Sequence, residues 1–306
     1  MINPKFTGLR ILALLVLQTL WVPTARSEPP RSPAFKEEAS KQTAIYQSKG
    51  QAVPDGYVIG RSLLSYTIAL PSEFTQSLAK LGPEDRWLDI GAGEGRAVLD
   101  YCTSKYDAML RGPEKKAKAI AMSIEDRRTI HWHQAAESLE PRQIQYLFGK
   151  RLREYSLEEL GEFDVITDVL GGFSYVENLS LFMEKTLGFL ELNGSFYTVL
   201  QDVRSENGTE RPFYPGASFL TEIKNADGSE LKMCSWLKSI SCVEVTCEAK
   251  PDWTPPIEAY RVRKVCSNVN VPRLLPIHFE AGTPPERRFQ LSNPPPALTA
   301  REAAQP

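Results

Sequence analysis

A short apolar run that ends in closely spaced glycines constrains this chain more than any other feature. Residues Trp87–Ile90 are apolar apart from Asp89, and Gly91, Gly93 and Gly95 follow before a helical pattern begins. Glycines at such a strand-to-helix junction let the backbone turn sharply and approach a ligand closely. Ligands of open α/β sheets bind at these junctions. We therefore expect a ligand-binding loop here.

The spacing of these glycines excludes two common phosphate-binding loops. A dinucleotide-binding loop needs a third glycine where this chain has Arg96, so a nicotinamide or flavin cofactor matches poorly. A Walker loop is excluded because no Gly-Lys-Ser/Thr follows. The acid at Asp89, two places before the first glycine, suits a ligand that presents a positive amino group, as the end of an amino acid does.

The rest of the central region alternates between strand-like and helix-like patterns. Short apolar runs occur at 87–90, 117–124, 144–148, 163–168 and 195–200, and amphipathic segments separate several of them. In the last third, polar and apolar residues alternate along two runs, which predicts an antiparallel hairpin that turns near residue 254. The predicted fold class is α/β: a doubly wound, mostly parallel Rossmann-like sheet that ends in an antiparallel hairpin.

The segment Trp87–Gly95 resembles the first motif of the class I S-adenosylmethionine-dependent methyltransferases. The resemblance extends from about residue 57 to 265 and is specific in this first motif. It implies S-adenosyl-L-methionine as the cofactor, with the three glycines beneath its methionine part. It also implies that Asp89 engages the cofactor's amino group. Glu125, or failing it Asp126, would accept hydrogen bonds from the ribose hydroxyls.

On the acceptor side the residues are less specific. Asp168 ends the fourth predicted strand and is the candidate base, and Tyr175 in the following loop is a candidate substrate contact. The competing interpretation makes Asp168 a helix cap and Tyr175 a packing residue. The residue that contacts adenine is not assigned, because the stretch 148–154 lacks the acid usual in the family.

The expected function is methyl transfer to an unidentified acceptor, which we expect to be a small molecule. The chain has 36 Lys and Arg against 38 Asp and Glu, so it carries no basic surplus that would favour nucleic acid. Two alternatives stay open: aminopropyl transfer, and a non-catalytic small-molecule-binding or interaction protein on a methyltransferase scaffold. The sequence leaves the oligomeric state open.

The N-terminal segment has the pattern of a secretory signal peptide. Basic residues precede the apolar run Ile11–Val22, which is shorter than the roughly 20 residues of a membrane span. We expect a signal peptide at 1–27, a linker at 28–55, a methyltransferase-like domain at 56–268 and a Pro-rich C-terminal tail at 269–306. The chain would then be periplasmic or secreted, or membrane-associated if the leader is retained.

Export conflicts with a cofactor that is made and used in the cytosol. Three resolutions are open. The leader is an uncleaved anchor with the domain facing the cytosol, or the protein works inside another cell, or catalysis has been lost.

Four of the five cysteines lie in the last third of the chain, and in an exported protein they predict disulfides. A hairpin turning near residue 254 places Cys242 opposite Cys266, which leaves Cys234 to pair with Cys247. The alternative is four reduced core thiols.

His131 and His133 share one strand face if this segment is extended, but zinc needs three or four ligands and no cluster of Cys or Asp accompanies them. We expect no metal site and interpret the segment as a partly exposed strand or loop.

Overall fold

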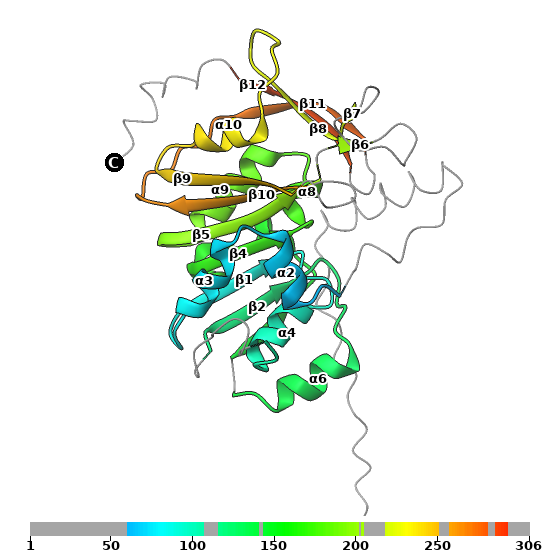
Figure 1. Cartoon of the computed structure of the whole chain (residues 1–306), viewed down its shortest axis with the longest axis vertical. Helices are drawn as coiled ribbons and strands as arrows, with labels where there is room; N and C mark the ends of the chain where they lie inside the picture. The colour runs from blue at the N-terminus through cyan, green and yellow to red at the C-terminus, as the bar shows by residue number, and fades with distance from the viewer. Residues whose placement is uncertain are drawn as a thin grey trace, which may run out of the picture. The chain divides into compact units, whose positions relative to one another are not determined.

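The structure is a computed structural model that describes residues 60–106, 116–140, 143–201, 203–204, 218–250, 257–280 and 285–292. The predicted signal peptide (1–27) and linker (28–55) lie outside these residues. The helices are α2 (Leu63–Ala69), α3 (Glu73–Lys80), α4 (Arg96–Cys102), α6 (Ile130–Glu137), η2 (Leu152–Glu154), α7 (Leu157–Leu160), α8 (Gly172–Tyr175), α9 (Leu179–Gly188) and α10 (Met233–Lys238). The strands are β1 (Arg86–Ile90), β2 (Lys118–Met122), β3 (Ile144–Leu147), β4 (Phe163–Val169), β5 (Leu190–Leu200), β6 (Val203–Arg204), β7 (Ser218–Phe219), β8 (Thr221–Lys224), β9 (Val243–Lys250), β10 (Ile257–Lys264), β11 (Leu274–Glu280) and β12 (Glu286–Leu291) (Figure 1).

Seven strands form one sheet in the order β3-β2-β1-β4-β5-β10-β9. The first five are mutually parallel, and β10 runs antiparallel to both β5 and β9. This confirms the predicted fold class, a doubly wound sheet that ends in an antiparallel hairpin. The strand order reverses between β1 and β4, so the glycine loop after β1 lies at the topological switch point, where such sheets bind ligands.

The sheet is covered on both faces, because successive side chains of a strand point to opposite sides. Trp87 and Leu88 are both fully buried, yet they belong to different apolar clusters. The cluster around Trp87 includes residues of α2, α3, α4 and α6, and the cluster around Leu88 includes residues of α9 and α10. In Figure 1, α2 and α3 lie in front of the central strands and α9 lies behind them. Burial on both sides explains why these strands are nearly continuous apolar runs.

Asn193 and Gly194, a pair typical of turns, lie inside β5. Phe163 pairs with Leu190 whereas Val165 pairs with Ser195, so β5 carries extra residues at this point. Asn193 has a φ of 70° within this irregularity. The Asn-Gly pair therefore makes a bulge that re-aims the strand and does not separate it from α9.

The Pro-rich segment from residue 269 is not an extended tail throughout, so that part of the predicted domain division is wrong. Strands β11 and β12 form a second sheet with β8, in the order β11-β12-β8, and Leu274 and Phe289 are buried in the core. Pro276 is tolerated because β11 is an edge strand, and the register shifts between Pro276 and His278. The remaining part of the predicted tail, 293–306, lies outside the described residues.

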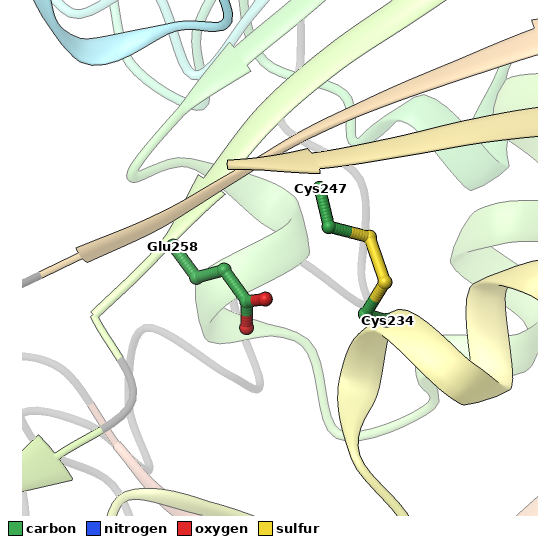
Figure 2. Close-up of side chains that lie close together, drawn as sticks. All are labelled: Cys234, Cys247 and Glu258. Atoms are coloured by element: carbon green, nitrogen blue, oxygen red, sulfur yellow. A yellow bond between two sulfur atoms is a disulfide. The ribbon is translucent and has the colours of Figure 1, made fainter. Parts of the chain in front are cut away.

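The predicted hairpin and both predicted disulfides are confirmed. Strands β9 and β10 pair from Val243–Lys264 to Lys250–Ile257, and the turn between them lies outside the described residues. Cys242 and Cys266 are bonded at the open end of the hairpin, and Cys234 on α10 is bonded to Cys247 on β9 (Figure 2). The Cα–Cα separations are 5.0 and 6.1 Å, respectively. The fifth cysteine, Cys102, is a buried free thiol.

Candidate functional site: a glycine loop at the switch point of the sheet

The loop after β1 turns through three glycines in the left-handed region of backbone conformation. The φ angles of Gly91, Gly93 and Gly95 are 67°, 57° and 70°. Only glycine adopts this region without strain, so the loop conformation explains why these positions are glycine. The absent side chains also permit close packing. A Cβ at Gly95 would lie 2.5 Å from the ring of Trp132, and a Cβ at Gly91 would lie 2.7 Å from the Cα of Gly171.

The two predicted parts of the cofactor site are brought together by one hydroxyl group. Tyr146 on β3 donates from its hydroxyl to the carbonyl oxygen of Gly93, and the same hydroxyl lies 3.3 Å from the carbonyl oxygen of Glu125. The backbone N–H of Arg127 donates to this hydroxyl at 3.3 Å. The glycine loop and the segment after β2 are therefore neighbours, as expected for loops that follow adjacent parallel strands.

Glu125 and Asp126 follow β2, and both carboxylates face neighbouring arginines. Glu125 pairs with Arg127 at 2.6 Å, and its side chain is 39% exposed. Asp126 accepts two hydrogen bonds from the guanidinium of Arg128, at 2.8 and 2.6 Å, and these bonds hold its pKa below the ordinary value. Glu125 is thus the more accessible of the two acids, and an exposed ion pair of this kind contributes only about 0–1 kcal/mol. Because this ion pair is weak, a ligand could replace Arg127 as the partner of Glu125.

Asp89 is fully buried beneath α2 and accepts two hydrogen bonds from side chains. The hydroxyl of Tyr66 on α2 donates to Oδ2 at 3.0 Å, and the hydroxyl of Thr167 on β4 donates to Oδ1 at 2.7 Å. The indole N–H of Trp87 donates to the same Thr167 oxygen at 2.9 Å. Burial raises the pKa of Asp89 to about 7, although the two hydroxyl donors oppose that shift. In this geometry Asp89 ties the end of β1 to α2 and β4.

Asp168 is also fully buried, and its carboxylate binds the backbone of the loop that follows it. Oδ1 accepts from the N–H of Gly171 at 2.8 Å, and Oδ2 accepts from the N–H of Phe173 at 3.0 Å. Burial raises the pKa of Asp168 to about 7, against the effect of these N–H donors. The capping interpretation weighed against the base therefore accounts for the contacts of this carboxylate. Tyr175, the candidate substrate contact, ends α8 and is half-buried.

The histidine segment is helical, so the expectation of a strand or loop is wrong. Thr129 caps α6 by accepting from the N–H of Trp132, and burial of that indole against Gly95 and Tyr146 anchors the helix. His131 and His133 are exposed, and residues two apart on a helix do not face each other. They do not share a face from which to hold a metal ion.

One group of potential metal ligands occurs among the described residues, and it consists of Cys234, Cys247 and Glu258 (Figure 2). The two sulfur atoms are bonded to each other, so neither is a free thiolate. Tyr260 donates its hydroxyl to the Glu258 carboxylate at 2.7 Å. In this oxidised state neither cysteine offers a thiolate, so Glu258 is the one member of the group that could still ligate a metal ion.

Four residues that shape this site are not predicted from the sequence: Tyr66, Tyr146, Thr167 and Arg287. Thr167 is a polar residue in the buried strand β4, directly before Asp168, which is a detectable signal for a polar contact. Tyr66 and Tyr146 lie in ordinary amphipathic or apolar runs. Arg287 lies in the segment expected to be a tail, so no local pattern identifies it.

Comparison with known proteins gives a match in structure only. No family model matches the chain, and no curated protein matches its sequence. A Listeria monocytogenes protein assigned to the class I S-adenosylmethionine-dependent methyltransferases has 11% identity and a TM-score of 0.42, over 78% of this chain and 71% of that one. An rRNA methylase from Streptococcus thermophilus has 12% identity and a TM-score of 0.39, over 63% and 95%. A precorrin-6y C5,15-methyltransferase from Geobacter metallireducens has 14% identity and a TM-score of 0.34, over 62% and 86%. At these values the similarity identifies neither ligand nor substrate, and the fold is defined by its own strand order.

The contact between Gly91 and Gly171 predicts a specific loss of stability. We expect Gly91→Ala to lower the free energy of unfolding by more than Gly149→Ala does. Both positions have positive φ, which costs an alanine about 1–2 kcal/mol, but a Cβ at Gly149 has no atom within 4 Å. Urea unfolding of both variants measures the difference. Equal losses of stability would show that the loops after β1 and β4 are not in close contact.

Burial of Asp89 predicts a pH-dependent stability. With a pKa of about 7 when folded and about 4 when unfolded, Asp89 binds more protons in the native state between these values. Its contribution to the free energy of unfolding therefore falls as pH rises from 4 to 7 and is constant above. We expect Asp89→Asn to lose less stability than the parent protein between pH 5 and pH 7.5 in denaturant unfolding. An unchanged pH dependence would contradict the burial of a titrating Asp89.

Proposed function

We propose that this protein binds S-adenosyl-L-methionine at Gly91–Gly95 and Glu125 and transfers its methyl group to a small-molecule acceptor. The observation that carries the proposal is the position of the Tyr146 hydroxyl, which contacts the carbonyl oxygens of Gly93 and Glu125. These two residues lie 32 positions apart, in segments that the family resemblance assigns to one cofactor. Their adjacency at the switch point of the sheet supports a shared ligand.

The residues present fit this cofactor in part. The glycine loop provides a backbone without side chains at the carboxyl end of β1, and Gly91 is exposed at that edge. The exposed Glu125 carboxylate is a pure acceptor with several lone pairs, which suits a pair of ribose hydroxyls. Asp89 is enclosed by Tyr66 and Thr167, so its role in the proposal is to hold the loop in place. When bound, the cofactor supplies an activated methyl group on a sulfonium.

The acceptor side supports positioning more than proton transfer. The carboxylate oxygens of Asp168 accept hydrogen bonds from the backbone N–H groups of Gly171 and Phe173. These bonds hold the loop to the end of β4. Methyl transfer depends strongly on the in-line approach of the acceptor, so an ordered loop contributes to the rate without a base. In the proposal Tyr175 contacts the acceptor and Asp168 shapes the loop that carries it.

The enclosure of Asp168 also favours a second candidate function, a non-catalytic module that binds the cofactor or a related small molecule. A buried carboxylate whose oxygens both accept from backbone N–H groups has a structural role that needs no acid–base chemistry. Turnover distinguishes the two functions. An enzyme forms S-adenosylhomocysteine with some member of an acceptor panel, whereas a binding module binds the cofactor without consuming it. An RNA fragment in that panel tests the assignment of a small-molecule acceptor.

We also propose that the protein is exported to the periplasm or secreted. The N-terminal pattern and the pairing of four cysteines into two disulfides support this, since disulfides persist in oxidising compartments. No helix within the described residues is long and apolar enough to span a membrane. If the protein acts outside the cytosol, its cofactor must be supplied there.

Calorimetric titration of the intact chain with S-adenosylmethionine and S-adenosylhomocysteine tests the proposal. We expect micromolar affinity for both, and we expect Glu125→Gln to weaken it about tenfold, because a hydrogen bond to a charged group contributes roughly 1.5–3 kcal/mol. Glu137→Gln, a change at an exposed acid on α6, is the matched control and is expected to bind as the parent does. A folded protein that binds neither compound would contradict both the enzyme and the cofactor-binding module.

A further inference from the structure

The loop between β4 and α9 is bound on its N–H groups by Asp168. The carboxylate holds the N–H groups of Gly171 and Phe173 at 2.8 and 3.0 Å. The loop contains α8, a helix of only four residues, which is too short to be stable by itself. External contacts must therefore determine its conformation.

The carbonyl groups of the same loop are bound by a buried arginine from the second sheet. Arg287 on β12 is fully buried, and its Nη1 donates to the carbonyl oxygens of Phe173 and Val176 at 2.9 and 3.0 Å. Its Nη2 donates to the hydroxyl of Thr221 on β8 at 3.0 Å. A guanidinium offers several donors in one rigid plane, so a single side chain serves both carbonyls and the neighbouring strand.

A buried cation of this kind is costly unless it is well bonded, so its presence requires a compensating arrangement. Here the compensation comes from the backbone carbonyls of the loop and from the negative charge of Asp168, whose pKa the Arg287 charge lowers against the effect of burial. Asp168 and Arg287 thus both bind one short loop. The acid accepts from its N–H groups, and the arginine donates to its carbonyl groups.

This loop lies directly against the glycine loop. A Cβ at Gly171 would lie 2.9 Å from the carbonyl oxygen of Ile90 and 3.1 Å from the Cα of Gly91. The contact is between backbones, with no side chain to absorb a shift. Displacement of residues 171–176 would therefore disturb the turn at Gly91 as well as the position of Tyr175.

We propose that Arg287 is a positioning residue of the ligand site: together with Asp168 it clamps residues 171–176 against the glycine loop, which makes the second sheet part of the site. The inference rests on the proposed function for its effect on ligand binding, whereas the clamp itself is independent of any ligand. It connects a residue in the last 20 positions of the chain to a turn nearly 200 positions earlier.

Hydrogen–deuterium exchange of the intact, ligand-free protein tests the clamp. In Arg287→Met we expect the amides of residues 171–176 to exchange about tenfold faster or more, because two carbonyl bonds to a charged donor are lost. The amides of β1 and β2 are expected to keep their protection. Arg288→Met is the matched control on the same strand, because Arg288 is half-exposed and pairs only with Glu222 and Glu286 among the described contacts. This control is expected to exchange as the parent does.

A second measurement relates the clamp to the ligand. Titration with S-adenosylhomocysteine is expected to show weaker binding to Arg287→Met and unchanged binding to Arg288→Met. If the parent protein binds no S-adenosylhomocysteine, the proposed function fails while the exchange result still decides the clamp.

Two results would overturn the proposal: exchange of residues 171–176 that equals the parent's, or a uniform rise across the whole sheet, which would indicate a merely structural role. If Arg287→Met does not fold, Arg287→Lys replaces it in the same comparison. Its ammonium keeps the charge but lacks the planar fork, so we expect faster exchange confined to residues 171–176. Parental exchange in a folded Arg287→Lys would equally contradict the clamp.

Discussion

The arrangement of the site depends on one backbone contact, between Gly91 after β1 and Gly171 after β4. Two neighbouring parallel strands end at the same edge of the sheet, and their following loops can approach this closely only because both positions lack a side chain. The strand order reverses at the same place, so the contact forms the floor of the region where doubly wound sheets bind ligands. The buried carboxylates at the ends of these strands, Asp89 and Asp168, then hold the elements around the contact in place.

The two acids illustrate how a buried carboxylate is used for architecture. Asp89 gathers hydroxyl donors from α2 and β4, and Asp168 gathers N–H donors from its own loop. Burial raises the pKa of each to about 7, so both are near the point of protonation at neutral pH. The free energy of unfolding is accordingly expected to be higher at mildly acidic pH than at neutral pH. The residue that we propose meets the ligand is Glu125, whose side chain is 39% exposed and forms an ion pair with Arg127.

Local patterns predicted the main sheet and the glycine loop, but few of the side-chain contacts that connect the parts of the site. Strands β1, β2 and β4 and the glycine loop follow from short-range apolar runs and from residues whose conformation only glycine adopts. The two disulfides follow from the spacing of cysteines about a hairpin turn. The role of Arg287 does not follow, because β12 pairs with β8, which lies more than 60 residues earlier in the chain, and no local period encodes such a pairing. The prolines near β11 pointed to a tail since proline is unfavourable in central strands, yet it is acceptable on an edge strand. The segment with His131 and His133 was predicted as a strand or loop because a short segment can fit both the helical and the strand period. Burial of Trp132 favours the helix.

The most direct test of the account is a crystal structure of the protein grown with S-adenosylhomocysteine. We expect density for the ligand along Gly91–Gly95, with its ribose hydroxyls on the Glu125 carboxylate and residues 171–176 in the same clamped conformation. Density at another place on the molecule, or a well-ordered glycine loop with Glu125 still paired to Arg127 and no ligand beside it, would contradict the assignment of this edge of the sheet as the cofactor site.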